Sequence, residues 1–201
     1  MPPNESITYI THNFKINLFK SFAIAQERIY TIDDIYALPD GQRAELIDGR
    51  MYMMTPPRRI HQEIVSQLTK VIGQYIDAHD GKCKVYPAPF AVFLNQDDRN
   101  YVEPDISVIC DMDKLDEYGC NGAPDWIIEI TSPTNPQNDY GVKLFKYRTA
   151  GVREYWIVNP QTNTVMVYDL ENEKKSNQYT FEDDVPVCIY EDLNIRISDL
   201  L

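Results

Sequence analysis

The stretch WIIEIT, residues 126–131, is the most informative segment of this sequence, because it places an acid inside an apolar run. Short apolar runs of this kind are typical of strands that are buried on both faces of a sheet. Burying the carboxylate of Glu129 there is costly unless it is paired with a cation or bound to a metal ion. The stretch therefore predicts a central strand with one buried acid, whose carboxylate is paired with a cation or bound to a metal ion.

Two further acids lie in or beside short apolar runs on the N-terminal side of this strand. Asp105 opens the run DISVI, and Glu45 lies inside the run RAELI. Three carboxylates from separate strands would converge on one hard cation such as Mg²⁺, which lowers the pKa of a bound water and stabilises charge on a phosphodiester. The alternative is structural: Asp105 caps a strand or a turn, and Glu45 pairs with Arg43 or Arg50.

The pattern outward from these strands predicts one α/β domain with a mixed sheet over residues 29–201. A capping box at Thr31 and Asp34 opens a short helix, and an Asp-Gly type I′ turn joins a hairpin over 43–54. Residues 1–28 lack sustained periodicity and are expected to form a weakly ordered N-terminal extension. The other expected elements are a long helix over 60–76, an extended edge segment over 83–94, strands over 105–110, 126–131, 152–158, 164–169, 178–181 and 185–190, and a helix over 139–150.

The chain is strongly acidic, which limits how it can contact nucleic acid. Its formal net charge is −12 and its pI is about 4.6. Such a chain does not hold nucleic acid by a general positive coat, so phosphate binding requires a local basic patch or a bound metal. Lys143, Lys146, Arg148 and Arg153 lie close together in the sequence and predict such a patch. The alternative is an ordinary solvated helix face.

The remaining composition points to a protein outside the membrane. No apolar run approaches the roughly 18 residues of a membrane-spanning helix, so no membrane partner is expected. The cysteines form no CxxC pair, and we expect reduced thiols in a cytoplasmic protein. Cys83 and Cys110 lie in strand-like runs and are expected to be small core residues.

Several short motifs occur together in a specific order, from about Tyr30 to Asp169. In this order and spacing they resemble the PD-(D/E)xK nuclease superfamily and, more closely, the Uma-type putative restriction endonucleases. The matching pieces are ELIDG at 45–49, PP at 56–57 with His61 after it, Pro104-Asp105, EITSPT at 129–134, Asp139 with Lys143 and Tyr147, and GVREYWIV at 151–158.

The resemblance implies a restriction-endonuclease-like core, in which helices flank a central mixed β-sheet. It implies that Asp105 and Glu129 are the metal-binding acids and that Glu45 is the additional acid of an N-terminal element. The superfamily places a lysine two residues after the second acid, where this sequence has Thr131. Lys143 is the candidate replacement, positioned to orient the attacking water or to steady the phosphate charge. The alternative is an ion pair of Lys143 with Asp139 on the same helix.

Three other residues are candidates for positions around this site. His61 lies at the start of the long helix, where it would hydrogen-bond a metal ligand or contact a phosphate. Thr131 follows the central acid in the sequence, and Tyr147 lies one helical turn beyond Lys143. For His61 the alternative is an ordinary helix residue with no role in the site.

These observations lead to a Mg²⁺-dependent endonuclease, with Mn²⁺ as the other candidate ion and DNA as the substrate. A homodimer is expected, because two cuts on antiparallel strands suit a two-fold assembly. The rival hypothesis is a catalytically inactive module of the nuclease fold that binds nucleic acid or a protein partner. A third hypothesis is a structural protein whose buried acids form salt bridges with Arg43 and Arg153.

Overall fold

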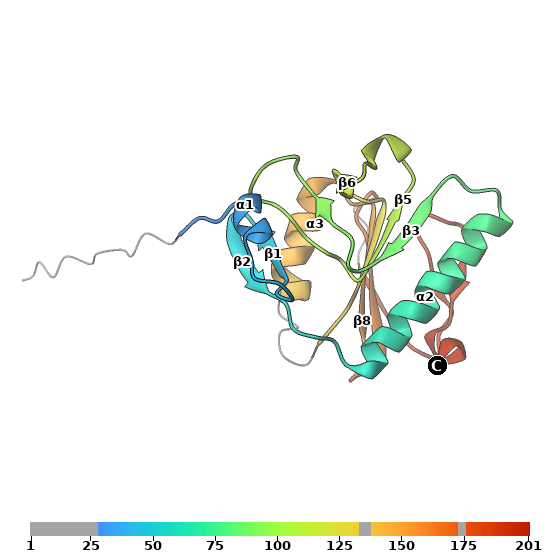
Figure 1. The fold of residues 1–201 in the computed structure, drawn as a ribbon. Helices are drawn as coiled ribbons and strands as arrows, with labels where there is room; N and C mark the ends of the chain where they lie inside the picture. Colours follow the sequence, from blue (N-terminus) through green and yellow to red (C-terminus); the bar gives the residue numbers. More distant parts are fainter. Residues whose placement is uncertain (1–27, 133–137, 173–175) are drawn as a thin grey trace, which may run out of the picture.

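The computed structural model describes residues 28–132, 138–172 and 176–201 (Figure 1). The N-terminal extension expected over residues 1–28 lies outside the described residues, apart from its last residue, Arg28. No helix in the described ranges is long and apolar enough to cross a membrane.

A six-stranded mixed sheet forms the centre of the fold. Strands β7 and β8 run parallel, and the other pairings in this sheet are antiparallel. The predicted fold class, a mixed sheet flanked by helices, is therefore confirmed. The strands, in their order across the sheet, are β10 (Asn177–Thr180), β9 (Thr164–Asp169), β8 (Glu154–Asn159), β7 (Trp126–Ile130), β5 (Ile106–Ile109) and β3 (Lys84–Pro87).

Helices cover the two faces of this sheet (Figure 1). The long helix α2 (Arg59–Ala78) packs on one face through an apolar stripe that includes Leu68 and Ile72. On the other face, a π-helical turn η2 (Asn138–Lys143) runs into α3 (Leu144–Ala150). Successive residues of a strand point to opposite faces, so Ile128 packs with the α2 side and Ile127 with the α3 side. Glu129 follows Ile128 and is therefore directed to the α3 side.

A hairpin beside α3 supplies the third acid. Strands β1 (Ala44–Ile47) and β2 (Arg50–Met53) are joined by Asp48 and Gly49, whose φ angles of 49° and 77° are those that a type I′ turn requires. A backbone bridge from Leu46 to Tyr101 holds the hairpin against the rest of the domain. The predicted hairpin and its turn type are confirmed.

Smaller elements complete the described chain. Helix α1 (Ile32–Tyr36) begins with the predicted capping box. Strands β4 (Val92–Phe93) and β6 (Cys120–Asn121) form a parallel pair, and β11 (Val185–Pro186) pairs with β12 (Asn194–Ile195). Two 3₁₀ helices are η1 (Met112–Lys114) and η3 (Ile197–Leu200).

Two predicted strands are shorter than expected. The extended segment over 83–94 divides into β3 and β4, which belong to different sheets. Its position at an edge is confirmed, since β3 is the last strand of the central sheet, as the nearby prolines predicted. The segment over 185–190 is a strand only at its first two residues, which pair with the short β12.

The prediction of reduced thiols is wrong for Cys83 and Cys110, which form a disulfide with a Cα–Cα distance of 3.9 Å. The antiparallel pairing of β3 with β5 sets Lys84 opposite Ile109. The next residues outward are the two cysteines, so the strand register brings them face to face. Sequence spacing alone does not reveal this register, because the cysteines lie 27 residues apart.

Candidate active site

Strand register places the two central acids side by side at one end of the sheet. The pairing of β5 with β7 sets Ile106 opposite Ile128, and continuing it by one residue sets Asp105 opposite Glu129. Directly opposed residues of an antiparallel pair point to the same face of the sheet. The Asp105 carboxylate is held in place because its Oδ2 accepts the backbone N–H of Ile130 at 2.7 Å.

Glu45 and Lys143 complete a buried ionic cluster with Glu129. The Lys143 Nζ lies 2.7 Å from Glu45 Oε2 and 2.9 Å from Glu129 Oε1. The lysine side chain is 9% exposed, and both carboxylate side chains are 6% exposed. Lys143 ends the π-helical turn, while Glu45 comes from the hairpin and Glu129 from the central sheet. Tertiary folding thus brings three distant parts of the chain to one point.

Neighbouring groups orient these acids. The Tyr147 hydroxyl donates to Glu129 Oε1 at 2.7 Å, from the same helical segment that carries Lys143. The backbone N–H of Glu103 donates to Glu45 Oε1 at 3.1 Å. These hydrogen bonds orient the carboxylates of Glu129 and Glu45 in the protein without a ligand.

His61 and Thr131 also lie at the site. The His61 Nε2 is 3.1 Å from Asp105 Oδ2, so the first turn of α2 reaches the end of the sheet. Its Nδ1 is buried and has no hydrogen-bond partner in the described structure. Thr131 is buried, and its backbone N–H donates to the Val158 carbonyl, which extends the β7–β8 pairing by one residue.

Asp139 is a fourth acid of the site, although the sequence predicted for it only an ion pair with Lys143 and no place among the metal-binding acids. Its carboxylate lies 3.9 Å from the Lys143 Nζ, at the limit of an ion pair, and its side chain is 14% exposed. Burial raises the pKa of Asp139 to about 6, although Lys143 opposes the shift. The i, i+4 spacing to Lys143 was the available signal for its place in the site.

Burial and crowding of like charges control the ionisation of the cluster. Burial raises the pKa of Glu129 well above its usual value, and the charges of Asp105 and Glu45 add to this against the opposing effect of Lys143. Burial lowers the pKa of Lys143, but attraction to Glu129 and Glu45 outweighs it and holds that pKa well above the usual value. The Lys143 ammonium group therefore stays charged and forms ion pairs with more than one acid.

These residues line a cavity of about 900 Å³. Strand ends, the start of α2, the hairpin and the π-helical turn all contribute to its wall. The predicted residues among those lining it are Glu45, His61, Asp105, Glu129, Thr131 and Lys143, and Asp139 lines it as well. Tyr147 lies behind the wall, fully buried against Glu129.

The donor chemistry of this cavity suits a hard cation, although the described side chains are not arranged as a metal site. Glu45, Asp105 and Glu129 offer the carboxylate oxygens that Mg²⁺ and Mn²⁺ prefer. Among the described residues, however, no group of three or more His, Cys, Asp or Glu side chains is positioned to hold a metal ion. The Lys143 ammonium itself lies between Glu45 and Glu129. A positive charge is thus favoured at this point.

The basic patch predicted from sequence is exposed only in part, since Arg148 is exposed and Arg153 is partly exposed. Lys143 and Lys146 are buried, and Lys146 pairs with Asp48. Arg153 pairs with Asp125 and Glu171. The alternative of a solvated helix face is wrong for the two lysines for the same reason.

The structural hypothesis expected Arg43 and Arg153 to form salt bridges with the buried acids, but both arginines pair with other residues. Arg43 forms an ion pair with Glu103, and Arg153 pairs with acids that lie just before β7 and just after β9. Glu103 in turn accepts a hydrogen bond from the Tyr101 hydroxyl at 2.7 Å. The arginines therefore do not neutralise Glu45 or Glu129, and Lys143 does.

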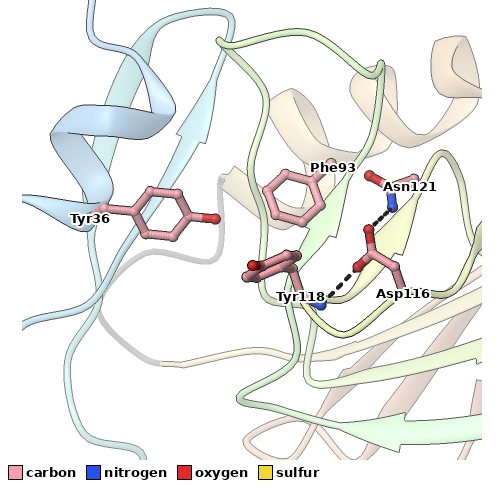
Figure 2. Close-up of a pocket in the computed structure, with 5 residues that line it drawn as sticks. All are labelled: Tyr36, Phe93, Asp116, Tyr118 and Asn121. Atoms are coloured by element: carbon pink, nitrogen blue, oxygen red, sulfur yellow. Dashed lines mark hydrogen bonds between the residues drawn. The ribbon is translucent and has the colours of Figure 1, made fainter.

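A second cavity, of about 490 Å³, is lined by aromatic side chains (Figure 2). Figure 2 shows Tyr36 on one side and Phe93 with Tyr118 on the other. Asp116 accepts the backbone N–H of Tyr118 at 2.8 Å and the side-chain amide of Asn121 at 2.7 Å. Its carboxylate therefore organises the local turn, and this cavity shares no lining residue with the acidic one.

Comparisons with known proteins agree with this fold and identify the family. The chain is similar to a crystal structure described as a putative nuclease belonging to DUF820 from Anabaena variabilis ATCC 29413, with a TM-score of 0.69 and 23% identity over 85% of this chain and 96% of that one. This likeness supports the restriction-endonuclease-like fold. A search of curated proteins gives no significant match. The Uma2 family, described as putative restriction endonucleases, matches residues 32–196. Since the match spans most of the sequence, the chain belongs to the Uma2 family.

Proposed function

We propose that this protein is a metal-dependent endonuclease that hydrolyses DNA phosphodiester bonds. The observation that carries the proposal is the convergence of Glu45, Asp105, Glu129 and Lys143 in one cavity at the end of the sheet. Burying several acids around one ammonium is a weak source of stability, because desolvation offsets the attraction. Such a cluster is therefore better explained by chemistry than by folding. Membership of the Uma2 family supports DNA as the substrate.

Each residue has a role in this proposal. Glu45, Asp105 and Glu129 would hold Mg²⁺ or Mn²⁺, which supplies an acidified water and offsets charge on the phosphate. The Lys143 ammonium donates to a phosphate oxygen or to the attacking water from its place beside Glu129. Tyr147 keeps Glu129 oriented through its hydroxyl, and His61 does the same for Asp105.

One observation favours a second candidate, the inactive module that binds nucleic acid or a protein. Lys143 neutralises Glu45 and Glu129 directly, and the described acids are not arranged around a vacant metal position. Acids whose charge is already balanced by a lysine of the same protein need no metal cation. In that case the cavity would bind its ligand without cleaving it.

Calorimetric titration with Mg²⁺ and with Mn²⁺ separates the two candidates. The wild type is compared with the double variant Asp105→Asn/Glu129→Gln. The matched control is Asp184→Asn/Glu182→Gln, which removes the same charge from exposed residues outside the cavity. We expect binding of one or two ions per chain, retained in the control and lost in the site variant. Plasmid cleavage in the presence of the same metal should likewise be retained in the control and lost in the site variant.

Absence of metal binding at millimolar concentration, both with and without DNA, would overturn the endonuclease proposal and favour the binding module. The expected homodimer and the cytoplasmic location stay predictions. Light scattering coupled to size-exclusion chromatography measures the oligomeric state, since a dimer has twice the 23.4 kDa mass of the chain.

A further inference from the structure

We infer that the acidic cavity takes an unpaired DNA strand rather than an intact duplex. This inference rests on the proposed function, because it assumes that the carboxylate cluster receives a phosphodiester. Three features of the cavity carry it: its depth, its apolar wall and its balance of charges.

The acids lie at the floor of the cavity. Side chains of Glu45 and Glu129 are 6% exposed, and that of Asp105 is 16% exposed. A phosphodiester must therefore enter the cavity before it meets them. The volume of about 900 Å³ lies within the range of small-molecule pockets. A strand that can bend its backbone inward fits such a space, whereas a duplex holds its phosphates on the outside of a stiff rod.

The wall above the acids is apolar on several sides. The end of β2, the connection to α2 and the first turn of α2 contribute most of this surface, and the segment after β3, the end of β7 and the turn after β8 contribute the rest. Met53 is 53% exposed, although it is a large hydrophobic side chain. The apolar residues lining the cavity are Met53, Met54, Pro56, Pro57, Ile60, Ala88, Pro89, Ile130 and Pro160.

An unpaired base is the part of a nucleic acid that matches this wall. In a duplex the faces of the bases are stacked on one another, and the surface offers phosphates and groove edges. Unpaired strands expose the faces, and proteins that bind them stack the bases on aromatic side chains. Among the described lining residues, Tyr52 offers such a side chain beside the apolar wall. The wall and the floor together suit a nucleotide whose phosphate reaches the acids while its base rests on the methionines and prolines.

The charges of the cavity are unfavourable for a duplex. The described lining holds four acids, namely Glu45, Asp105, Glu129 and Asp139. Arg43, Arg58 and Lys143 are the lysines and arginines among the described lining residues, and two of these already pair with carboxylates. A duplex carries one charge per about 1.7 Å of its axis, twice the density of a single strand, so a cavity with so few cations repels a duplex more strongly.

The test measures binding without turnover. Fluorescence anisotropy is recorded in Mg²⁺ on the Glu129→Gln variant, with one labelled oligonucleotide alone and the same oligonucleotide annealed to its complement. We expect the single strand to bind at least about tenfold more tightly than the duplex, a difference of about 1.4 kcal/mol. Equal affinity, tighter duplex binding or no binding of either would overturn the inference.

A wall variant tests whether the apolar surface is responsible. Met53→Ser/Met54→Ser, in the same Glu129→Gln background, should weaken single-strand binding about fivefold or more and leave duplex binding unchanged. The control is Met112→Ser, which removes an exposed methionine outside the cavity and should change neither affinity. An unchanged single-strand affinity in the wall variant would contradict the assignment of the wall.

Cleavage by the wild type keeps this inference separate from the proposed function. The substrate is a duplex with an unpaired flap, and cuts are expected within the flap. Cuts inside the duplex would overturn the inference and leave the nuclease proposal intact. Preferential single-strand binding with no cleavage in Mg²⁺ or Mn²⁺ would overturn the nuclease proposal and leave the assigned ligand intact.

Discussion

At the scale of single residues, Lys143 decides the character of the site. The superfamily pattern expects a lysine on the central strand, where this chain has Thr131. Lys143 reaches the same acids from the π-helical turn before α3, and its Nζ lies within 3 Å of Glu45 and of Glu129. The ammonium group of the site therefore comes from the π-helical turn rather than from the central strand.

Replacing Lys143 with Met should destabilise the protein strongly. The substitution leaves Glu45 and Glu129 buried without their counter-ion, which costs about 3–5 kcal/mol in comparable buried pairs. The free energy of unfolding in urea at pH 7 measures the effect. Arg148→Met is the control, because Arg148 is an exposed residue of α3, which follows Lys143 directly, and should change stability by less than about 0.5 kcal/mol. Equal stability of the Lys143 variant and the wild type would contradict the ion pairs.

Replacing Asp139 with Asn should change the pH dependence of stability. The pKa of Asp139 is raised to about 6 in the folded protein from a usual value near 3.8, so the folded state binds this proton more tightly than the unfolded state. Its contribution is fully present below pH 3.8 and is lost as the pH rises through 6. The variant should therefore gain stability relative to the wild type between about pH 4 and pH 6.

Urea unfolding at several pH values in this range, without metal, measures the difference between the two proteins. Glu182→Gln, an exposed acid outside the cavity, should show a parallel curve to the wild type. A constant difference between Asp139→Asn and the wild type across the range would show that the acid is not buried in this way.

At the scale of elements, the β1–β2 hairpin is what makes the site complete. The central sheet alone supplies Asp105 and Glu129, and the hairpin adds Glu45 from its own small sheet. The turn at Asp48 and Gly49 determines which face of β1 meets Lys143. A shift of register by one residue would turn Glu45 away from the cluster.

Gly49→Ala should weaken the hairpin. The φ of Gly49 is +77°, and a Cβ there would lie 2.6 Å from the Ile29 Cγ2. We expect a loss of about 1–2 kcal/mol in unfolding free energy by chemical denaturation. Gly73→Ala is the matched control, because that glycine lies inside α2 with its nearest neighbour atom at 3.5 Å. The control should be neutral or stabilising, since Ala favours a helix. A loss of equal size in both variants would mean that the turn conformation is not the cause.

At the scale of the whole molecule, the site lies where separate layers meet. Strand β7 ends there, β5 and α2 begin there, and the hairpin and the π-helical turn η2 line the cavity as well. The protein carries a net charge of −12, and its described lysines near the site are buried in ion pairs. Nucleic acid must therefore be held by few cationic contacts.

This charge distribution predicts a weak dependence of single-strand binding on salt. If Arg43 and Arg58 at the cavity make the main phosphate contacts, the slope of log affinity against log salt should be about −1 to −2. Anisotropy titrations of the Glu129→Gln variant from low to physiological salt measure this slope. A slope near −5 would reveal a broad basic surface and contradict the assignment of a local site.

Local patterns in the sequence determined most elements and the identity of the acids. The long helix follows from apolar residues at helical spacing, and the hairpin follows from Asp-Gly between two short strands. The acid inside an apolar strand is recognisable without a structure, because its burial is costly unless something engages it. The motif order also identified the family, which the match over residues 32–196 confirms.

Tertiary structure alone decided which of these groups meet. The disulfide of Cys83 with Cys110 follows from the register of β3 on β5, and the pairing of Lys143 with Glu45 joins residues 98 positions apart. The place of Asp139 in the cavity likewise depends on how the π-helical turn packs against the end of the sheet. Local propensity and periodicity act over a few residues, whereas register and packing are set by the burial of whole faces. For this reason the sequence identified the acids, and only the folded chain showed that a lysine lies between two of them.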